Sequence, residues 1–183
     1  MHLKIATNQQ VKEYEPIIEE LRHKYLNTLD MIGDDLLGDY KAFELPHIIS
    51  EVKKQKGNRI LDFGTGTSCL PAYLNSLGYE VWCLDDGSWH PEVNETNYNE
   101  VYGCKVKYVV DDIVKNPNCL PDNYFDVIYS VSVMEHIPQY ERYIEVLNKK
   151  LKKGGKHLHV IDQPIPDIYQ PDEGMGRIIY ELN

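Results

Sequence analysis

The chain has 183 residues and carries 29 acidic against 19 basic side chains, so its formal net charge is −10. This acidity disfavours a nucleic-acid-binding surface, because the phosphate backbone repels carboxylates. The composition, 42% apolar and 26% charged, fits one globular unit, without the apolar run of roughly 20 residues that a membrane span needs. The first ten residues lack the apolar core of a secretory signal, so we expect a cytoplasmic protein.

Two amphipathic helices are predicted near the N-terminus. Apolar side chains recur at spacings of three and four over residues 11–25 and again over 42–52. Pro16 falls inside the first pattern, so this helix is either kinked or begins just before the proline. We expect residues 1–56 to form a helical segment that covers the binding site of the domain formed by 57–183.

From Gly57 onward, short apolar strands alternate with helical stretches, a pattern typical of βαβ units and a parallel sheet with helices on both faces. The last helix is expected from about Pro138 to Lys153. The fold class is therefore α/β, a Rossmann-like, doubly wound, mostly parallel sheet. Five strands are predicted: Arg59–Phe63, Glu80–Leu84, Lys105–Val110, Phe125–Val131 and Lys156–Ile161.

A glycine turn follows the first of these strands. Gly64 and Gly66 have no Cβ atoms, so a ligand can approach the backbone closely. Asp62 precedes the turn and would repel a pyrophosphate, and Cys69 stands where a dinucleotide site needs its third small residue. A nicotinamide oxidoreductase is thus the weaker interpretation. A cation such as S-adenosylmethionine, which has ammonium and sulfonium groups and no phosphate, suits the carboxylate.

Two later strands also end in aspartates. Asp85 lies 21 residues after Gly64, where a carboxylate can accept both ribose hydroxyls. Asp112 follows the third strand and can accept a hydrogen bond from an adenine amino group. Because the carboxyl ends of parallel strands share one edge of a sheet, we expect these acids to converge at one site.

Over roughly residues 57–162 the sequence resembles the class I S-adenosylmethionine-dependent methyltransferases. The resemblance rests on R-I-L-D-F-G-T-G-T-S, V-W-C-L-D-D-G, Y-V-V-D-D-I, N-Y-F-D-V-I-Y-S-V-S-V-M-E-H-I-P and L-K-K-G-G-K-H-L-H-V, in this order. It implies S-adenosyl-L-methionine as cofactor and ten binding residues: Asp62, Gly64, Thr65 and Gly66 at the methionine part, Asp85 at the ribose, Asp86 beside the adenine, Asp112 and Ile113 at the adenine edge, Ser130 on the methionine side, and Ser68 in place of the family's third glycine.

The acceptor is predicted to be a small molecule, a sugar or a lipid intermediate. The fourth strand ends in S-V-S-V instead of the N/D-P-P-Y signature with which DNA-base methyltransferases hold a flipped base. No catalytic residue is assigned. His136 is a candidate base, and its alternative role is to hydrogen-bond the loop or pack against cofactor. Trp89 either covers the adenine, belongs to a substrate lid or lies in the interior. His157 and His159 share a strand face but lack a third ligand, so no metal is predicted.

The sheet is expected to be shortened after its fifth strand. Only 21 residues follow Asp162, whereas the family usually adds a helix and two antiparallel strands, and 177–182 can form at most one short strand. Either this is a truncated variant whose sheet edge is covered by a homo- or hetero-oligomeric partner, or the sequence is a fragment. The alternative function is accordingly a non-catalytic, methyltransferase-like binding or scaffold subunit that a partner chain completes.

Overall fold

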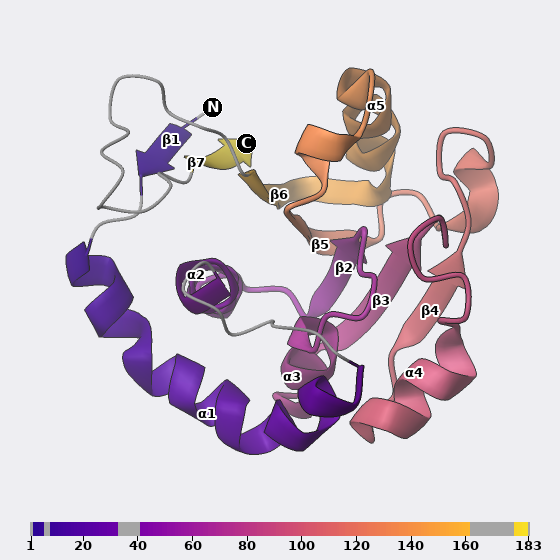
Figure 1. The fold of residues 1–183 in the computed structure, drawn as a ribbon. Helices are drawn as coiled ribbons and strands as arrows, with labels where there is room; N and C mark the ends of the chain where they lie inside the picture. The colour runs from indigo at the N-terminus through magenta and orange to yellow at the C-terminus, as the bar shows by residue number, and fades with distance from the viewer. Residues whose placement is uncertain (1, 6–7, 33–40, 162–177, 183) are drawn as a thin grey trace.

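The computed structural model describes residues 2–5, 8–32, 41–161 and 178–182, in which the chain forms one seven-stranded sheet (Figure 1). The strand order is β1-β7-β6-β5-β2-β3-β4. Strands β6, β5, β2, β3 and β4 are parallel, and β7 pairs antiparallel with both β6 and β1. The strands are β1 (His2–Ile5), β2 (Arg59–Phe63), β3 (Glu80–Asp85), β4 (Lys107–Val110), β5 (Phe125–Val131), β6 (Leu151–Ile161) and β7 (Ile178–Leu182).

Helices cover both faces of the sheet, which confirms the predicted α/β class (Figure 1). Leu21, Ile48 and Tyr73 belong to a buried cluster that α1, α2, α3 and α4 form with one face. Leu61 and Leu147 belong to a second cluster, between the other face and α5. The helices are α1 (Asn8–Ile32), α2 (Lys41–Lys53), α3 (Leu70–Ser76), α4 (Glu95–Tyr102) and α5 (Tyr140–Lys150), with 3₁₀ turns η1 (Pro117–Cys119) and η2 (Met134–His136).

Several boundaries differ from the prediction: β3 ends one residue later, at Asp85, β4 begins two residues later, at Lys107, and α5 spans Tyr140–Lys150. Helix α1 runs through Pro16 and begins at Asn8, so the interpretation that it starts just before the proline is wrong. Strand β6 begins at Leu151 and takes in two lysines that the pattern placed in the preceding helix. One of them, Lys152, places its Nζ 2.7 Å from Oδ1 of Asp126 on β5. This ion pair and the pairing of Phe125 with Leu151 extend the strand.

The sheet does not end at β6. One short strand was expected after residue 162, and β7 is that strand. Strand β1 was not predicted, because the N-terminal segment was expected to be helical only. It pairs with β7, so two strands of the same chain lie beyond β6, the edge that a partner was expected to cover.

Candidate functional site

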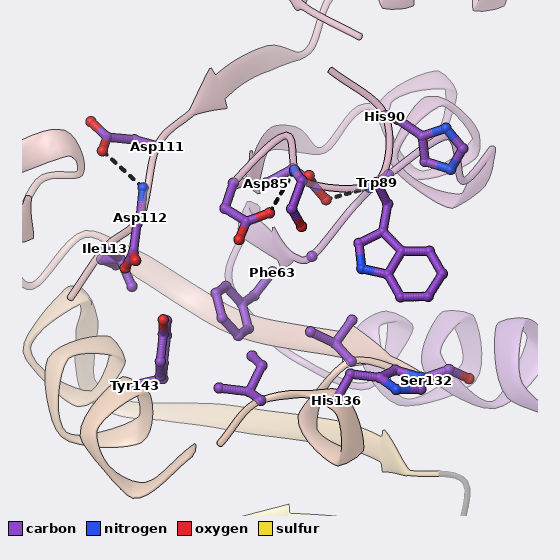
Figure 2. Close-up of a pocket in the computed structure, with 16 residues that line it drawn as sticks. Phe63, Asp85, Trp89, His90, Asp111, Asp112, Ile113, Ser132, His136 and Tyr143 are labelled. Carbon is purple, nitrogen blue, oxygen red and sulfur yellow. Dashed lines mark hydrogen bonds between the residues drawn. The ribbon is translucent and has the colours of Figure 1, made fainter. Parts of the chain in front are cut away.

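A cavity of about 340 Å³ lies at the carboxyl ends of β2, β3, β4 and β5 (Figure 2). The chain first adds β3 and β4 on one flank of β2 and then β5 and β6 on the other, so the direction of the sheet switches at β2. Ligands of open α/β sheets bind at such a switch point, in the crevice outside the strand ends. Among the predicted residues, six line the cavity: Gly64, Gly66, Asp85, Asp86, Asp112 and Ile113.

The glycine turn requires both of its glycines. Gly64 has φ +75°, and a Cβ atom there would lie 2.5 Å from Cγ2 of Val133. Gly66 has φ +51°, also in the left-handed region that favours glycine. The Gly64 N–H donates to the carbonyl oxygen of Leu84 at 2.7 Å, which ties the turn to the end of β3. The turn therefore contributes backbone without side chains of its own to the cavity wall, and the Val133 side chain packs against Gly64.

The Asp85 carboxylate is held by the two loops on either side of it. Its Oδ2 accepts a hydrogen bond from the Gly66 N–H at 2.8 Å, and its Oδ1 accepts one from the Gly87 N–H at 2.9 Å. A carboxylate has about four lone-pair sites, so these two bonds leave acceptor capacity for a ligand's hydroxyls. Asp85 thus couples the glycine turn to the β3 loop and remains available in the cavity.

The side of the glycine turn away from the cavity is held by tyrosines. Three hydroxyls donate hydrogen bonds to three successive carbonyl oxygens: Tyr108 to Gly66, Tyr102 to Thr67 and Tyr98 to Ser68. Tyr98 and Tyr102 lie one turn apart on α4, and Tyr108 lies on β4. Sequence reasoning missed this tyrosine cluster (Tyr98, Tyr102, Tyr108), because no local pattern relates these residues to the turn.

One end of the cavity is formed by β4 and α5 (Figure 2). Asp112 accepts the Val114 N–H at 2.9 Å, and its Oδ2 lies 2.9 Å from Nζ of Lys115. Although partial burial opposes it, these contacts hold the pKa of Asp112 below its ordinary value. Tyr143, on α5, also lines this end of the cavity. The centroids of its ring and of the Phe63 ring are 5.8 Å apart. Neither aromatic residue was predicted, because both read as core positions.

Asp62, Thr65 and Ser68 are absent from the cavity lining. Asp62 lies on the opposite face of β2, next to Tyr129 of β5, and its side chain is buried. Burial raises its pKa to about 8, and Asp85 adds to this shift, while the neighbouring hydroxyls of Tyr129 and Thr65 oppose it. The Thr65 hydroxyl also donates to the Asp62 carbonyl oxygen at 3.2 Å. These residues support the turn from within the core.

Ser130 also lies outside the lining, in a buried hydrogen-bonded chain beneath α5. Its Oγ is 2.8 Å from Nδ1 of His159, whose Nε2 is 3.2 Å from Nδ1 of His157; Nε2 of His157 is 3.1 Å from Oδ1 of Asn148. All three contacts are satisfied when both imidazoles are neutral and protonated at Nε2. Ser132, beyond the end of β5, lines the cavity instead.

The charge of the cavity is one-sided. Four carboxylates line it, from Asp85, Asp86, Asp111 and Asp112, and none of the described lining residues is Lys or Arg. A pyrophosphate would meet repulsion here, whereas an ammonium or sulfonium group would be attracted. Together with the bare glycine backbone, these donors and acceptors fit S-adenosylmethionine. In the described part of the chain, no group of three His, Cys, Asp or Glu residues is arranged to hold a metal ion.

That residues 1–56 cover the binding site stays a prediction. No described residue of this segment lines the cavity; Tyr25 and Ile48, for example, are buried in the core on the other face of the sheet. Tyr25 contacts Tyr102 edge to face, with ring centroids 5.7 Å apart. Helix α1 is thereby connected to the tyrosine cluster.

None of the described helices is long and apolar enough to cross a membrane.

Comparisons with known proteins agree with this geometry. A ubiquinone biosynthesis O-methyltransferase of Vibrio cholerae is 28% identical over 127 residues, which cover 66% of this chain and 51% of that protein. The chain thus spans about half the length of the relatives that it matches. Protein PH0226 of Pyrococcus horikoshii OT3 has a similar fold, with a TM-score of 0.58 and 19% identity over 72% of this chain and 57% of that one.

A structure described as a SAM-dependent methyltransferase from Archaeoglobus fulgidus matches with a TM-score of 0.52 and 18% identity, over 66% of this chain and 52% of that one. At this identity, the two structural likenesses establish the fold alone. The family described as "Methyltransferase domain" matches residues 61–159, from within β2 to within β6, and so includes every strand end at the cavity. The chain belongs to this methyltransferase-domain family, as the sequence motifs predicted.

Proposed function

We propose that this protein binds S-adenosyl-L-methionine in the cavity at the strand ends and transfers its methyl group to a small-molecule acceptor. The observation that carries the proposal is the combination of a glycine turn with four carboxylates, in a lining whose described residues include no Lys or Arg. When bound, the cofactor supplies an activated methyl group, so the protein has mainly to position the reactants.

We assign the residues at the cavity to three parts of the cofactor: the methionine part, the ribose and the adenine. We assign the methionine part to the backbone of Gly64 and Gly66, and the ribose hydroxyls to Asp85, whose orientation two backbone N–H groups hold. Asp112 and the backbone of Ile113 are assigned to the adenine edge, with Asp86 beside the ring. Asp62, Thr65, Ser68 and Ser130 act indirectly, because none of them lines the cavity.

Calorimetric titration with S-adenosylhomocysteine, the demethylated product, tests this assignment without an acceptor. Asp85→Asn and Gly64→Val should each weaken binding at least tenfold. Glu100→Gln, which removes an exposed carboxylate from α4, is the control for net charge and should bind like the parent. Unchanged affinity in both site variants, or tighter binding of NAD than of S-adenosylmethionine, would refute the proposal.

A small-molecule acceptor is supported by the acidic charge and by the O-methyltransferase named among the relatives. The non-catalytic scaffold is less well supported, since it was motivated by missing strands and β7 and β1 now lie beyond β6. Turnover of an acceptor by the isolated chain distinguishes the two. A cytoplasmic location belongs to the same proposal, supported by four free cysteines, which suit a reducing compartment.

A further inference from the structure

The end of the cavity opposite Asp112 and Tyr143 is formed by two rings (Figure 2). Trp89 follows β3, and His136 belongs to η2 after β5; their ring centroids are 6.0 Å apart and their planes are inclined by 45°. The Trp89 side chain is 78% exposed although it lines a cavity. An indole so placed offers most of its ring surface to a second molecule.

Building on the proposed function, we propose that Trp89 and His136 form the acceptor subsite, and that the acceptor is an uncharged, planar aromatic compound with a ring hydroxyl. Trp89 contacts the aromatic ring. His136 receives the proton of the hydroxyl group. Neither ring belongs to the six lining residues that are assigned to the cofactor.

The charge of the cavity excludes acidic acceptors. An acceptor that carries a carboxylate or phosphate would share the cavity with Asp85 and Asp86, from the same loop as Trp89, and the described lining residues offer no Lys or Arg to offset the repulsion. A planar ring, in contrast, stacks on or against the edge of an indole. The charge of the cavity disfavours organic acids and the exposed indole favours a planar ring, so we assign a neutral aromatic acceptor.

The hydroxyl group also explains the imidazole. A neutral hydroxyl is a weak nucleophile, and removing its proton during the reaction requires a base, for which imidazole is suited near neutral pH. The O–H bond breaks and its proton passes to His136; the electron pair left on oxygen forms the new O–CH₃ bond, and the pair of the broken C–S bond stays on sulfur. Because His136 is exposed, it can return the proton to solvent.

Binding is tested in the presence of saturating S-adenosylhomocysteine, which permits no turnover. Catechol is the probe, with benzoate as the charged control and cis-1,2-cyclohexanediol as the non-planar control. The chain has two tryptophans, so a Trp82→Phe background leaves Trp89 as the only reporter of indole fluorescence. Catechol should quench it saturably, and neither control should. In calorimetry, Trp89→Ala should weaken catechol binding at least tenfold, whereas Tyr140→Ala, which removes another exposed aromatic ring, should not.

The role of His136 is tested by the pH dependence of methyl transfer to catechol. His136→Gln should reduce kcat about 100-fold at pH 7 while catechol affinity stays within threefold. The defect should shrink toward pH 10, because the acceptor then ionises without a base. His90 and the four lining carboxylates are present in both proteins, so they do not account for a difference between the two profiles.

Failure of this inference differs from failure of the proposed function. If S-adenosylhomocysteine binds but catechol does not, or if benzoate binds as well as catechol, the acceptor class is wrong and the cofactor assignment stands. Equal catechol affinity in Trp89→Ala would remove Trp89 from the subsite. A His136→Gln defect that is constant across pH would assign His136 a structural role. If S-adenosylhomocysteine itself does not bind, both proposals are lost.

Discussion

The Tyr108 hydroxyl donates a hydrogen bond to the carbonyl oxygen of Gly66 at 2.8 Å, across 42 residues of sequence. The same glycine donates its N–H to Asp85 on the cavity side. The N–H and the carbonyl group of Gly66 are thus each hydrogen-bonded to a side chain, one from β3 and one from the neighbouring strand β4. This arrangement sets the orientation of the glycine turn before any ligand arrives.

Tyr108→Phe should weaken binding of S-adenosylhomocysteine about fivefold. The variant loses one hydrogen bond to the partly buried Gly66 carbonyl, which costs about 1 kcal/mol. Calorimetry measures the affinity, and thermal unfolding measures the stability. Tyr124→Phe is the matched control: it removes a tyrosine hydrogen bond to Glu80 at the far end of the sheet and should alter stability without altering affinity. Equal affinity in the two variants would contradict the positioning role.

Gly64→Ala should abolish measurable cofactor binding and destabilise the fold by more than 2 kcal/mol. The new Cβ would have an unfavourable φ and would lie 2.5 Å from Val133, so strain and steric overlap add. Gly78→Ala shares the positive φ, at +94°, but its Cβ would have nothing within 4 Å. It should cost about 1 kcal/mol, from backbone strain, and leave binding intact. Chemical denaturation of both variants measures the difference.

The buried histidine chain should make the protein acid-sensitive. Burial lowers the pKa of His157 to about 4 and that of His159 to about 3, and for His159 the neighbouring imidazole adds to the shift. Both therefore favour the neutral form in the fold, so their contribution to stability is complete above pH 6.5 and is lost as the pH falls toward 4 and 3. At about 1.4 kcal/mol per pKa unit, roughly 3.5 kcal/mol is at stake for His157 and roughly 5 kcal/mol for His159 over the full range.

Urea unfolding between pH 7 and 4 measures this loss. His159→Phe removes one titrating group and leaves Ser130 without that partner, so the variant should be less stable at pH 7 yet lose less stability on acidification. An exposed histidine, His23, provides the control, because His23→Gln should leave the pH dependence unchanged. A parent protein equally stable at pH 7 and pH 4.5 would contradict the prediction.

Asp62 should make the stability fall as the pH rises above neutrality, which is the opposite of the effect of the two histidines. Its pKa of about 8 in the fold exceeds the ordinary value, so the folded state retains a proton that the unfolded state has lost. Stability should therefore fall as the pH rises from 7 to 8, a window in which both buried histidines are neutral. Asp62→Asn should flatten this slope by about 1 kcal/mol per pH unit.

Denaturation at closely spaced pH values measures the slope of each protein. Asp126→Asn is the control: burial opposes, but Lys152 and the N–H groups of Arg59 and Asn58 hold the pKa of Asp126 below its ordinary value. That carboxyl is ionised throughout the window, so its replacement should shift the curve without changing its slope. A slope that persists in Asp62→Asn would assign the pH dependence to another group.

Local patterns in the sequence predict the five parallel strands, the sheet class and the residues at the strand ends, but not β1. The bounds of β2 and β5 follow from short apolar runs, and Gly64, Asp85 and Asp112 were found because parallel strands direct their carboxyl ends to one edge. Such features depend on a residue's neighbours in the chain, so they can be predicted from the sequence alone. The family resemblance drew on the same segments.

Only the tertiary structure decided which side chains reach the cavity and what holds them. Asp62 is adjacent to the glycine turn in sequence, yet the alternation of β2 turns it into the core. The tyrosine cluster, Tyr143 and the pairing of Trp89 with His136 join segments separated by tens of residues. No local periodicity encodes such contacts, because they arise from how the strands and helices pack against one another.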